Sequence, residues 1–254
     1  MNTLSKERKA AVIKALVEGA SIRSVARATG VDKDTVTRVL VEVGAFCSLY
    51  QHHALVRLPC TRIEADEIWA FVGAKEANKT RDDQGDIWTY TAICADTKLM
   101  VSWVVGKRTP DSTQAFMDDL ASRLSKRIQL STDALRQYPG AVERAFGWNG
   151  CDYAQITKSY GVEAGAYTNR GRYSPSPVVT GVEKVAIMGN PDPRKVSTSY
   201  NERQNLNMRM QMRRFTRLTN AFSRKAENHA HAVSLHFMVY NFVKPHGTLT
   251  KAAK

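Results

Sequence analysis

The first 45 residues place their hydrophobic side chains with a helical period. Val12 and Leu16 fall on one side of a helix that Gly19 ends. Residues 21–40 then predict two further helices, joined by a turn at Gly30, where a positive φ costs little. This pattern is typical of a helix-turn-helix, and it predicts a small all-α domain over residues 1–45.

The second helix of this motif has a polar outward face. Asp32 or Asp34 is placed to cap the helix, while its apolar residues turn back to the core. Four polar or basic residues point outward: Lys33, Thr35, Thr37 and Arg38. Such a face suits the major groove of DNA, so we expect these four to bind DNA. A plain three-helix bundle without a DNA contact is the alternative.

After an expected linker over residues 46–60, the pattern changes from helical to extended. Three runs are rich in β-branched and aromatic residues and are separated by turn residues, at 61–72, 86–95 and 99–105. An amphipathic helix at 111–125, a short apolar strand at 128–132 and a helix at 138–146 follow. The order of three antiparallel strands, helix, strand and helix predicts an α/β fold, an RNase H-like mixed sheet covered by helices.

The remainder of this catalytic domain, which we expect to span residues 61–254, is less regular. Pro175, Pro177, Pro191 and Pro193, with several glycines and serines, predict an irregular insertion at about 147–199. From Asn201 the pattern is again helical, to 222 and then from about 225 to 243.

Charge and cysteine content narrow the class of protein. Thirty-seven Lys and Arg against 24 Asp and Glu give a formal charge of +13. A chain this basic binds polyanions readily, because each neutralised phosphate releases counterions, although RNA or an anionic membrane surface would attract it too. The four cysteines form no C-x-x-C pair, and no apolar run approaches the roughly 20 residues that span a bilayer. We expect a cytoplasmic protein with double-stranded DNA as its partner and no membrane association.

Three acids stand where phosphodiester chemistry would need them. Asp66 lies inside a strand-like run, where an acid is disfavoured, Asp133 ends a second such run, and Glu202 begins a helix. Cleavage by two Mg²⁺ ions, or by Mn²⁺ in their place, needs hard oxygen ligands held close together. We expect these three carboxylates to bind the metal. Asp96 is an alternative second acid, although a tight turn explains it without chemistry.

Glu64 and Glu67 flank Asp66 in the same run. Strand alternation puts Glu64 on the face of Asp66. Either glutamate could act as an outer-shell base, but we expect both to lie at solvated strand edges.

Three segments resemble insertion-sequence-1 family transposases, which are DDE-type enzymes. Residues 65–73 (ADEIWAFVG) are similar to the first catalytic block of that family, and residues 201–210 (NERQNLNMRM) with the following 213–223 are similar to its third block. Residues 240–246 (YNFVKPH) are similar to a tail shared by many DDE transposases and integrases. The chain departs from the family in having no N-terminal cysteine pair for a zinc module, and it ends soon after His246, where relatives continue.

The resemblance implies a transposase that binds the terminal inverted repeats of an insertion sequence and catalyses DNA cleavage and strand transfer. Asp66, Asp133 and Glu202 would then form the triad. Arg209 lies two helical turns after Glu202 on the same face, where it would hold a DNA phosphate. A basic surface would extend beyond it: Arg213, Arg214, Arg217, Arg224 and Lys225.

Because two element ends must be held together, we expect a homo-oligomer on DNA. An inactive transposase that serves as a DNA-binding regulator, and an RNase H-like nuclease without strand transfer, are the alternatives.

Overall fold

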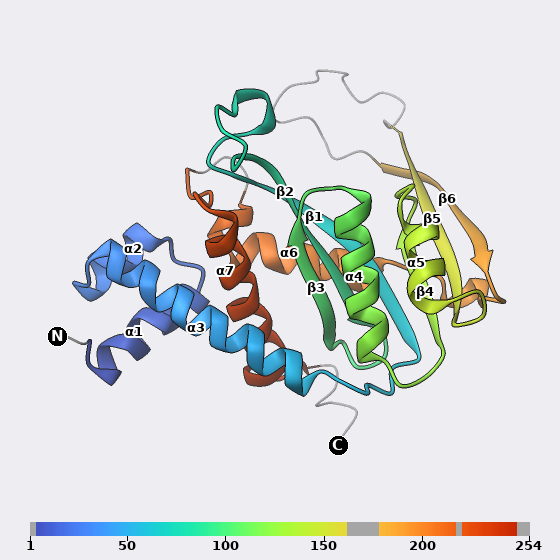
Figure 1. The fold of residues 1–254 in the computed structure, drawn as a ribbon, viewed down its shortest axis with the longest axis horizontal. Helices are drawn as coiled ribbons and strands as arrows, with labels where there is room; N and C mark the ends of the chain where they lie inside the picture. The colour runs from blue at the N-terminus through green and yellow to red at the C-terminus, as the bar shows by residue number, and fades with distance from the viewer. Residues whose placement is uncertain (1–3, 162–177, 217–219, 248–254) are drawn as a thin grey trace.

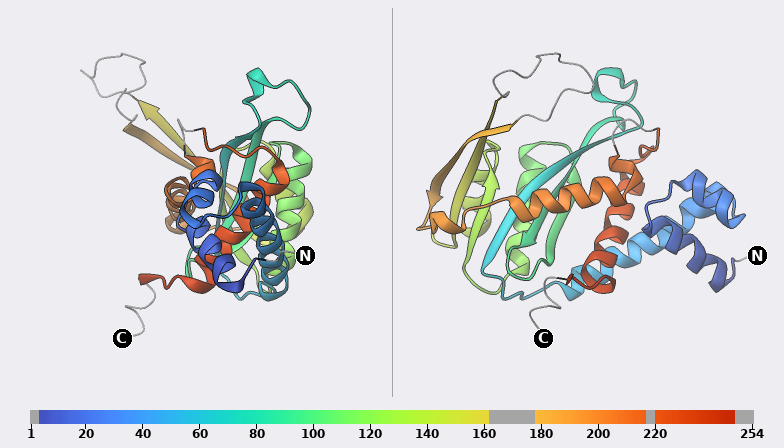
Figure 2. Two further views of the ribbon diagram at one scale, coloured as in Figure 1. Left: turned by 90° about the vertical axis from the view of Figure 1, so that its left-hand side faces the viewer. Right: turned by 180° about the vertical axis from the view of Figure 1, so that it is seen from behind.

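The computed structural model describes residues 4–161, 178–216 and 220–247. Within these residues the chain forms a six-stranded mixed sheet and seven α-helices (Figure 1). Helices lie on both faces of the sheet, and three N-terminal helices extend from one side of the molecule (Figure 2). No helix among the described residues is long and apolar enough to cross a membrane.

The sheet has the strand order β3-β2-β1-β4-β5-β6. Strands β1 (Arg62–Val72), β2 (Gly85–Cys94) and β3 (Met100–Gly106) are antiparallel, and β4 (Ile128–Asp133) is parallel to β1. Helix α4 (Pro110–Arg123) precedes β4, and α5 (Tyr138–Phe146) follows it. The predicted order of these six elements is confirmed, and the mixed sheet is compatible with an RNase H-like fold.

Two hydrophobic cores hold the helices to the sheet. On one face, Phe116 and Leu120 of α4 pack with Ile63 and Tyr90 from the strands. On the other face, apolar residues of α6 (Ser199–Gln211) and α7 (Ala226–Met238), such as Met208, pack against β1. Residues of β1 therefore pack into both cores, which explains why the sequence of this strand is almost continuously apolar apart from its acidic residues.

The prediction of irregular structure over residues 147–199 is wrong for two segments. Cys151–Gly161 forms β5, which is parallel to β4, and Val178–Met188 forms β6, which is antiparallel to β5. Pro191 and Pro193 follow β6 and leave its ladder intact, while Pro175 and Pro177 lie outside the described residues. A proline that flanks a strand does not disrupt it, because the ladder needs no backbone N–H donor at that position.

The N-terminal residues form α1 (Lys6–Val17), α2 (Ile22–Thr29) and α3 (Lys33–Ala54). Gly30 ends α2 in the left-handed conformation with φ 63°, as predicted. Oδ1 of Asp32 accepts hydrogen bonds from the backbone N–H groups of Asp34 at 2.8 Å and Thr35 at 3.4 Å. The cap of α3 is therefore Asp32, one of the two predicted candidates.

The expected linker over residues 46–60 is wrong for most of its length, because α3 continues to Ala54. Gly44 in the middle of α3 lies directly against His231 of α7, and Nε2 of Gln51 donates to the carbonyl of Ser234 at 3.0 Å. The N-terminal helices are thus joined to the sheet-bearing part by one rigid helix that packs along α7 (Figure 1).

The helix that begins near Asn201 is shorter than predicted. It ends at Gln211, because Met212 adopts an extended conformation, and a 3₁₀ turn at Arg213–Phe215 follows. The chain then returns to the sheet, where the N–H of Gly73 donates to the carbonyl of Ser223 at 2.8 Å. Helix α7 and a π-helical turn at Val239–Val243 complete the described chain, close to the second predicted range.

Candidate active site

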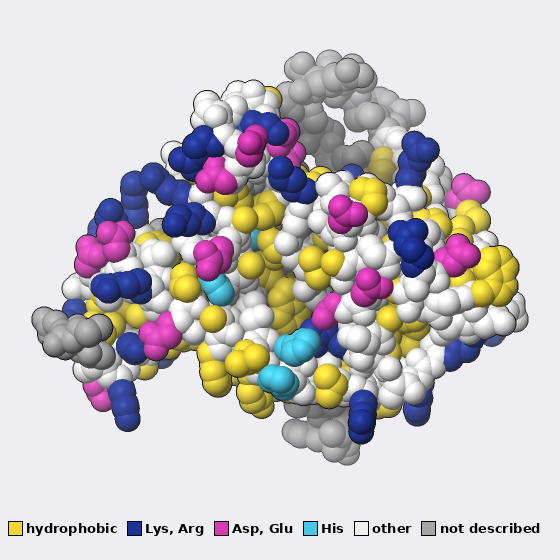
Figure 3. All heavy atoms as spheres, viewed as in Figure 1, with side chains coloured by type: hydrophobic (Ala, Val, Ile, Leu, Met, Phe, Trp, Pro, Cys, Tyr) yellow, Lys and Arg dark blue, Asp and Glu magenta, His cyan; other side chains and the backbone are white. Residues whose placement is uncertain are grey.

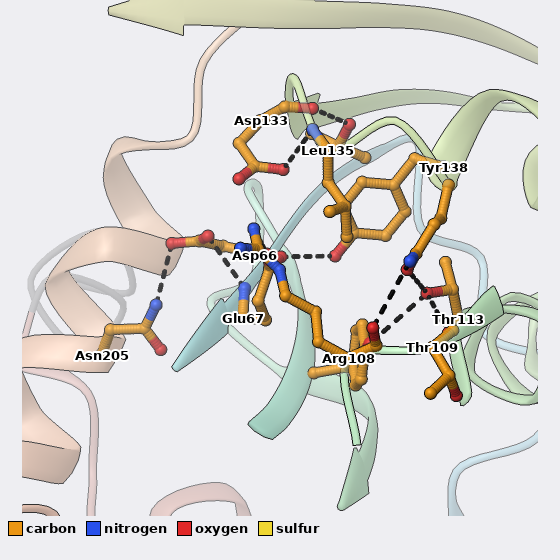
Figure 4. A network of polar contacts seen from close by, with 12 residues as sticks. Asp66, Glu67, Arg108, Thr109, Thr113, Asp133, Leu135, Tyr138 and Asn205 are labelled. Carbon is orange, nitrogen blue, oxygen red and sulfur yellow. Dashed lines mark hydrogen bonds and ion pairs between the residues drawn. The ribbon is translucent and has the colours of Figure 1, made fainter. Parts of the chain in front are cut away.

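Strand register brings Asp66 and Asp133 together. The parallel pairing of β1 with β4 ends at Ala65 opposite Thr132, so the next residue of each strand is an aspartate. One carboxylate oxygen from each of Asp66, Glu67 and Asp133 lies within 4.8 Å of the other two. Figure 4 shows these carboxylates converging beside α6.

The two oxygens of Asp66 are each fixed by a hydrogen bond. Oδ1 accepts from the N–H of Glu67 at 2.8 Å, and Oδ2 accepts from Nδ2 of Asn205 on α6 at 2.8 Å. Burial raises the pKa of Asp66 to about 7, and the charges of Asp133 and Glu67 add to the increase. Burial and the neighbouring carboxylates thus both disfavour the ionised form of Asp66.

Asp133 is oriented by the turn that follows β4. Its Oδ1 accepts from the N–H of Leu135 at 3.1 Å, an arrangement in which a short acidic side chain closes its own turn. Burial raises the pKa of Asp133, against the opposing effects of this hydrogen bond and of the nearby Arg108 charge. Both predicted aspartates are thus held in place by backbone N–H groups.

Glu67 is buried, so the prediction of a solvated strand edge is wrong. Its Oε2 accepts from Oη of Tyr138 at 3.1 Å, and its Oε1 pairs with the guanidinium of Arg108. Burial raises the pKa of Glu67. The charge of Asp133 raises this pKa further, and the charge of Arg108 lowers it. Arg108 also lies over the ring of Trp88, 4.6 Å from its centroid. Arg108 and Tyr138 come from distant parts of the chain, and no sequence pattern marks them.

Glu64 is also buried and has a different task. Its Oε2 accepts from the N–H groups of Tyr200 at 2.7 Å and Asn201 at 3.2 Å, so this carboxylate caps the first turn of α6. Nδ2 of Asn201 in turn donates to the carbonyls of Glu64 at 3.0 Å and Thr91 at 2.7 Å. This exchange fixes the start of α6 on the sheet and positions Asn205 over Asp66.

Glu202, the third expected acid, lies on α6 but outside the group of three carboxylates. Its side chain is 45% exposed, forms an ion pair with Lys158 of β5, and accepts from Oγ1 of Thr198 at 2.6 Å. Its charge nevertheless contributes to the raised pKa of Asp66, so it lies within electrostatic range of the site.

Asp96 is held away from the acids. It pairs with the guanidinium of Arg62 and accepts from Oγ1 of Thr61 at 2.7 Å. This is a structural role at the turn after β2, and it leaves Asp96 without a contact to Asp66.

The donor set of Asp66, Glu67 and Asp133 fits a hard divalent cation. Mg²⁺ and Mn²⁺ prefer carboxylate oxygens, and a bound cation would offset the burial that raises the pKa of all three groups and the mutual repulsion that adds to it for Asp66 and Glu67.

The residues expected to bind DNA are dispersed over two regions. On α3, Lys33 and Arg38 are exposed and Thr35 and Thr37 are partly exposed. After α6, three further cations are exposed: Arg213, Arg224 and Lys225. Lysine and arginine side chains are prominent over α2 and α3 on the left of Figure 3.

Arg214 does not extend this surface as expected. It is half-buried and donates from Nη1 to Oγ of Ser223 at 2.7 Å, and burial lowers its pKa to about 10. Arg209 is half-buried on α6, and Arg217 lies outside the described residues. The role of Arg214 is therefore to fix the segment after α6 and not to meet solvent.

No protein-family model matches the sequence, and no curated protein matches it either.

Proposed function

We propose that this chain is a DDE-type transposase that resembles the insertion-sequence-1 family, with an RNase H-like catalytic unit and an N-terminal helix-turn-helix. The observation that carries the proposal is the group of carboxylate oxygens from Asp66, Glu67 and Asp133 within 4.8 Å of one another. They lie between the two central strands of the sheet, where the pairing of β1 with β4 ends, and the carboxyl ends of strands are a place where open sheets hold ligands. The net charge of +13 supports DNA as the substrate.

Asp66 and Asp133 would hold the metal, with Glu67 or Glu202 as the third carboxylate. Bound Mg²⁺ supplies a Lewis acid that polarises water and stabilises charge on the oxygens around phosphorus. The remaining residues prepare the ligands. Asn205 orients Asp66, and the paired contacts of Tyr138 and Arg108 hold Glu67 against Asp133.

The proposed reaction has two steps at the same site. Water first attacks a phosphorus of the DNA backbone and displaces the 3′-oxygen, which leaves as a free 3′-hydroxyl. That hydroxyl then attacks a phosphorus of the target DNA and displaces the 3′-oxygen of the target strand. Each step exchanges one phosphorus–oxygen bond for another, so no tyrosine or serine nucleophile is required. The exposed face of α3 with Lys33, Thr35, Thr37 and Arg38 would read the terminal repeats, and two ends would be held by a homo-oligomer.

A strand-transfer assay tests this proposal. Purified protein is incubated with Mn²⁺ or Mg²⁺ and a labelled duplex that carries the terminal repeat, and joined products are measured. We expect joining by the native protein and by Asp96→Asn, whose carboxylate is engaged with Arg62, and none by Asp133→Asn. Equal joining by Asp133→Asn would reject the site.

The same assay separates the alternatives. Cleavage without joining identifies a nuclease of the same fold. Binding to the repeat with no cleavage by any of the three proteins identifies a DNA-binding regulator. Both outcomes would contradict the proposed transposase.

A further inference from the structure

A large cleft lies between α2 with the start of α3 on one side and the end of α6 with part of α7 on the other. Its volume is about 1210 Å³, above the range of roughly 300–1000 Å³ typical of small-molecule pockets. Residues of α2 and the start of α3 form one wall, and the segment after α6 forms the other together with α7. The size and the open form suit a polymer better than a small ligand.

The walls of this cleft carry cations from separate elements. Arg23 and Arg27 of α2 and Lys33 of α3 lie on one side, and Arg213, Arg224 and Lys225 lie on the other. Lys244, after α7, adds a further positive charge. Among the described residues that line the cleft, Asp34 is the one acid, and it lies 3.8 Å from Nζ of Lys33. The positive charge of the cleft is therefore available to bind an external anion.

The walls are held at a fixed separation. A Cβ on Gly19, at the turn between α1 and α2, would lie 2.5 Å from the carbonyl oxygen of Gln211, so this turn touches the last residue of α6. Gly44 makes an equally close approach to His231 on α7. The cleft is therefore preformed, and binding need not order its walls.

Helix α6 connects the cleft with the acids. Asn205 donates to Asp66 and Gln211 ends the helix, and six residues at about 1.5 Å each give about 9 Å. At about 3.4 Å per nucleotide of one strand, this length corresponds to about three nucleotides. Lys33 belongs both to the cleft and to the outward face of α3, so the two surfaces are continuous.

We infer that this cleft binds the sugar–phosphate backbone of the DNA substrate, about three nucleotides from the phosphate that is cut. The inference rests on the proposed function, and it assigns DNA contacts to α2 and to Lys244, which a helix-turn-helix that reads DNA through α3 alone would not use.

The salt dependence of DNA binding tests the cleft without requiring catalysis. The double variant Arg23→Ala/Arg27→Ala is compared with Lys126→Ala/Arg194→Ala, which removes the same charge at exposed positions outside the cleft. Fluorescence anisotropy in EDTA gives Kd over a range of salt. Each lost phosphate contact lowers the slope of log K against log salt by about 0.9, so we expect a fall of about 2 for the cleft variant and little change for the control.

A second pair on the opposite wall, Lys225→Ala/Lys244→Ala, guards against a local defect in α2. Equal slopes in the native protein and both cleft variants would overturn the inference, whether or not the protein cuts DNA. A lower slope in both cleft variants, together with no cleavage by the native protein, would instead support the DNA-binding cleft and contradict the proposed transposase.

The position of the cleft along the DNA, counted from the phosphate that is cut, can be measured by crosslinking. The native cysteines are buried, so Arg213→Cys offers a selectively reactive thiol for a photoactivatable group. We expect crosslinks centred about three nucleotides from the cut. Crosslinks spread evenly along the DNA, or centred more than a helical turn away, would contradict the proposed path.

Discussion

Nδ2 of Asn205 on α6 donates a 2.8 Å hydrogen bond to Oδ2 of Asp66 on β1. Oδ1 of the same amide is buried and has no hydrogen-bond partner among the described residues. One buried side chain thus links the helix that carries Glu202 to the strand that carries the first acid. The start of that helix is fixed independently by Glu64 and Asn201, so the link has a defined geometry.

Asn205→Ala tests this link. Without the amide, the ionised form of Asp66 loses a donor, and hydrogen bonds to charged groups contribute about 1.5–3 kcal/mol. We expect metal-dependent cleavage to slow about tenfold at neutral pH, with a pH–rate profile displaced to higher pH. Leu206→Ala, at an exposed position of the same helix outside the cleft, is the control and should keep the native profile. Identical effects of both substitutions would mean that α6 is merely destabilised.

The raised pKa of Asp66 predicts a stability that depends on pH. The pKa is about 7 in the folded protein against an ordinary 3.8, so the folded state binds this proton more tightly than the unfolded state. The free-energy cost of burying the ionised Asp66 carboxylate is absent below about pH 4, increases between pH 4 and pH 7, and is full above pH 7. In EDTA at pH 8 we expect Asp66→Asn to have a free energy of unfolding higher than that of the native protein by roughly 2–4 kcal/mol, seen as a higher unfolding temperature, with the difference closing at pH 4. A gap that is constant with pH would contradict the shift.

The elements that the sequence predicts correctly are those with a strong local period. Strands β1 to β3 and helices α4 and α5 each have a clear apolar pattern and flanking turn residues. The meeting of Asp66 and Asp133 also follows from local signals, because each ends or interrupts a strand and parallel neighbours align their edges.

Features that depend on tertiary contacts were not predictable. Residues 46–54 lack a helical apolar pattern because the buried positions of α3 there are Cys47 and Gln51, while Phe46 and Leu49 are exposed at 63% and 60%. Glu67 joins the acidic group only because Arg108 and Tyr138 reach it from other elements. A single sequence does not record such partners.

The close approach of Gly44 to His231 predicts the sign of a substitution. Helix propensity alone predicts that Gly44→Ala stabilises the protein by up to about 1 kcal/mol. The added Cβ would lie 2.5 Å from Cβ of His231 and 2.6 Å from its carbonyl oxygen, so α3 must move away from α7. We expect a loss of about 1–3 kcal/mol in the free energy of unfolding, measured by urea titration. Gly140→Ala in α5 is the control, because its Cβ meets only the flexible end of Arg144 at 3.3 Å, and it should be neutral or stabilising.

The ion pair between Lys158 and Glu202 predicts that the Lys158 charge opposes metal binding. Lys158→Met leaves the Glu202 carboxylate without its cation and makes the potential at Asp66 more negative. A partly exposed pair is worth about 0.2–1 kcal/mol, so we expect Mn²⁺ to bind up to about fivefold more tightly, measured by the loss of the free-ion EPR signal. Lys184→Met on β6 removes the same charge from an exposed lysine that donates to the carbonyl of Pro193, and it should leave Mn²⁺ binding unchanged. Adding Glu202→Gln to Lys158→Met should abolish the gain. Weaker binding in the single variant would show that Lys158 supports the metal site and does not oppose it.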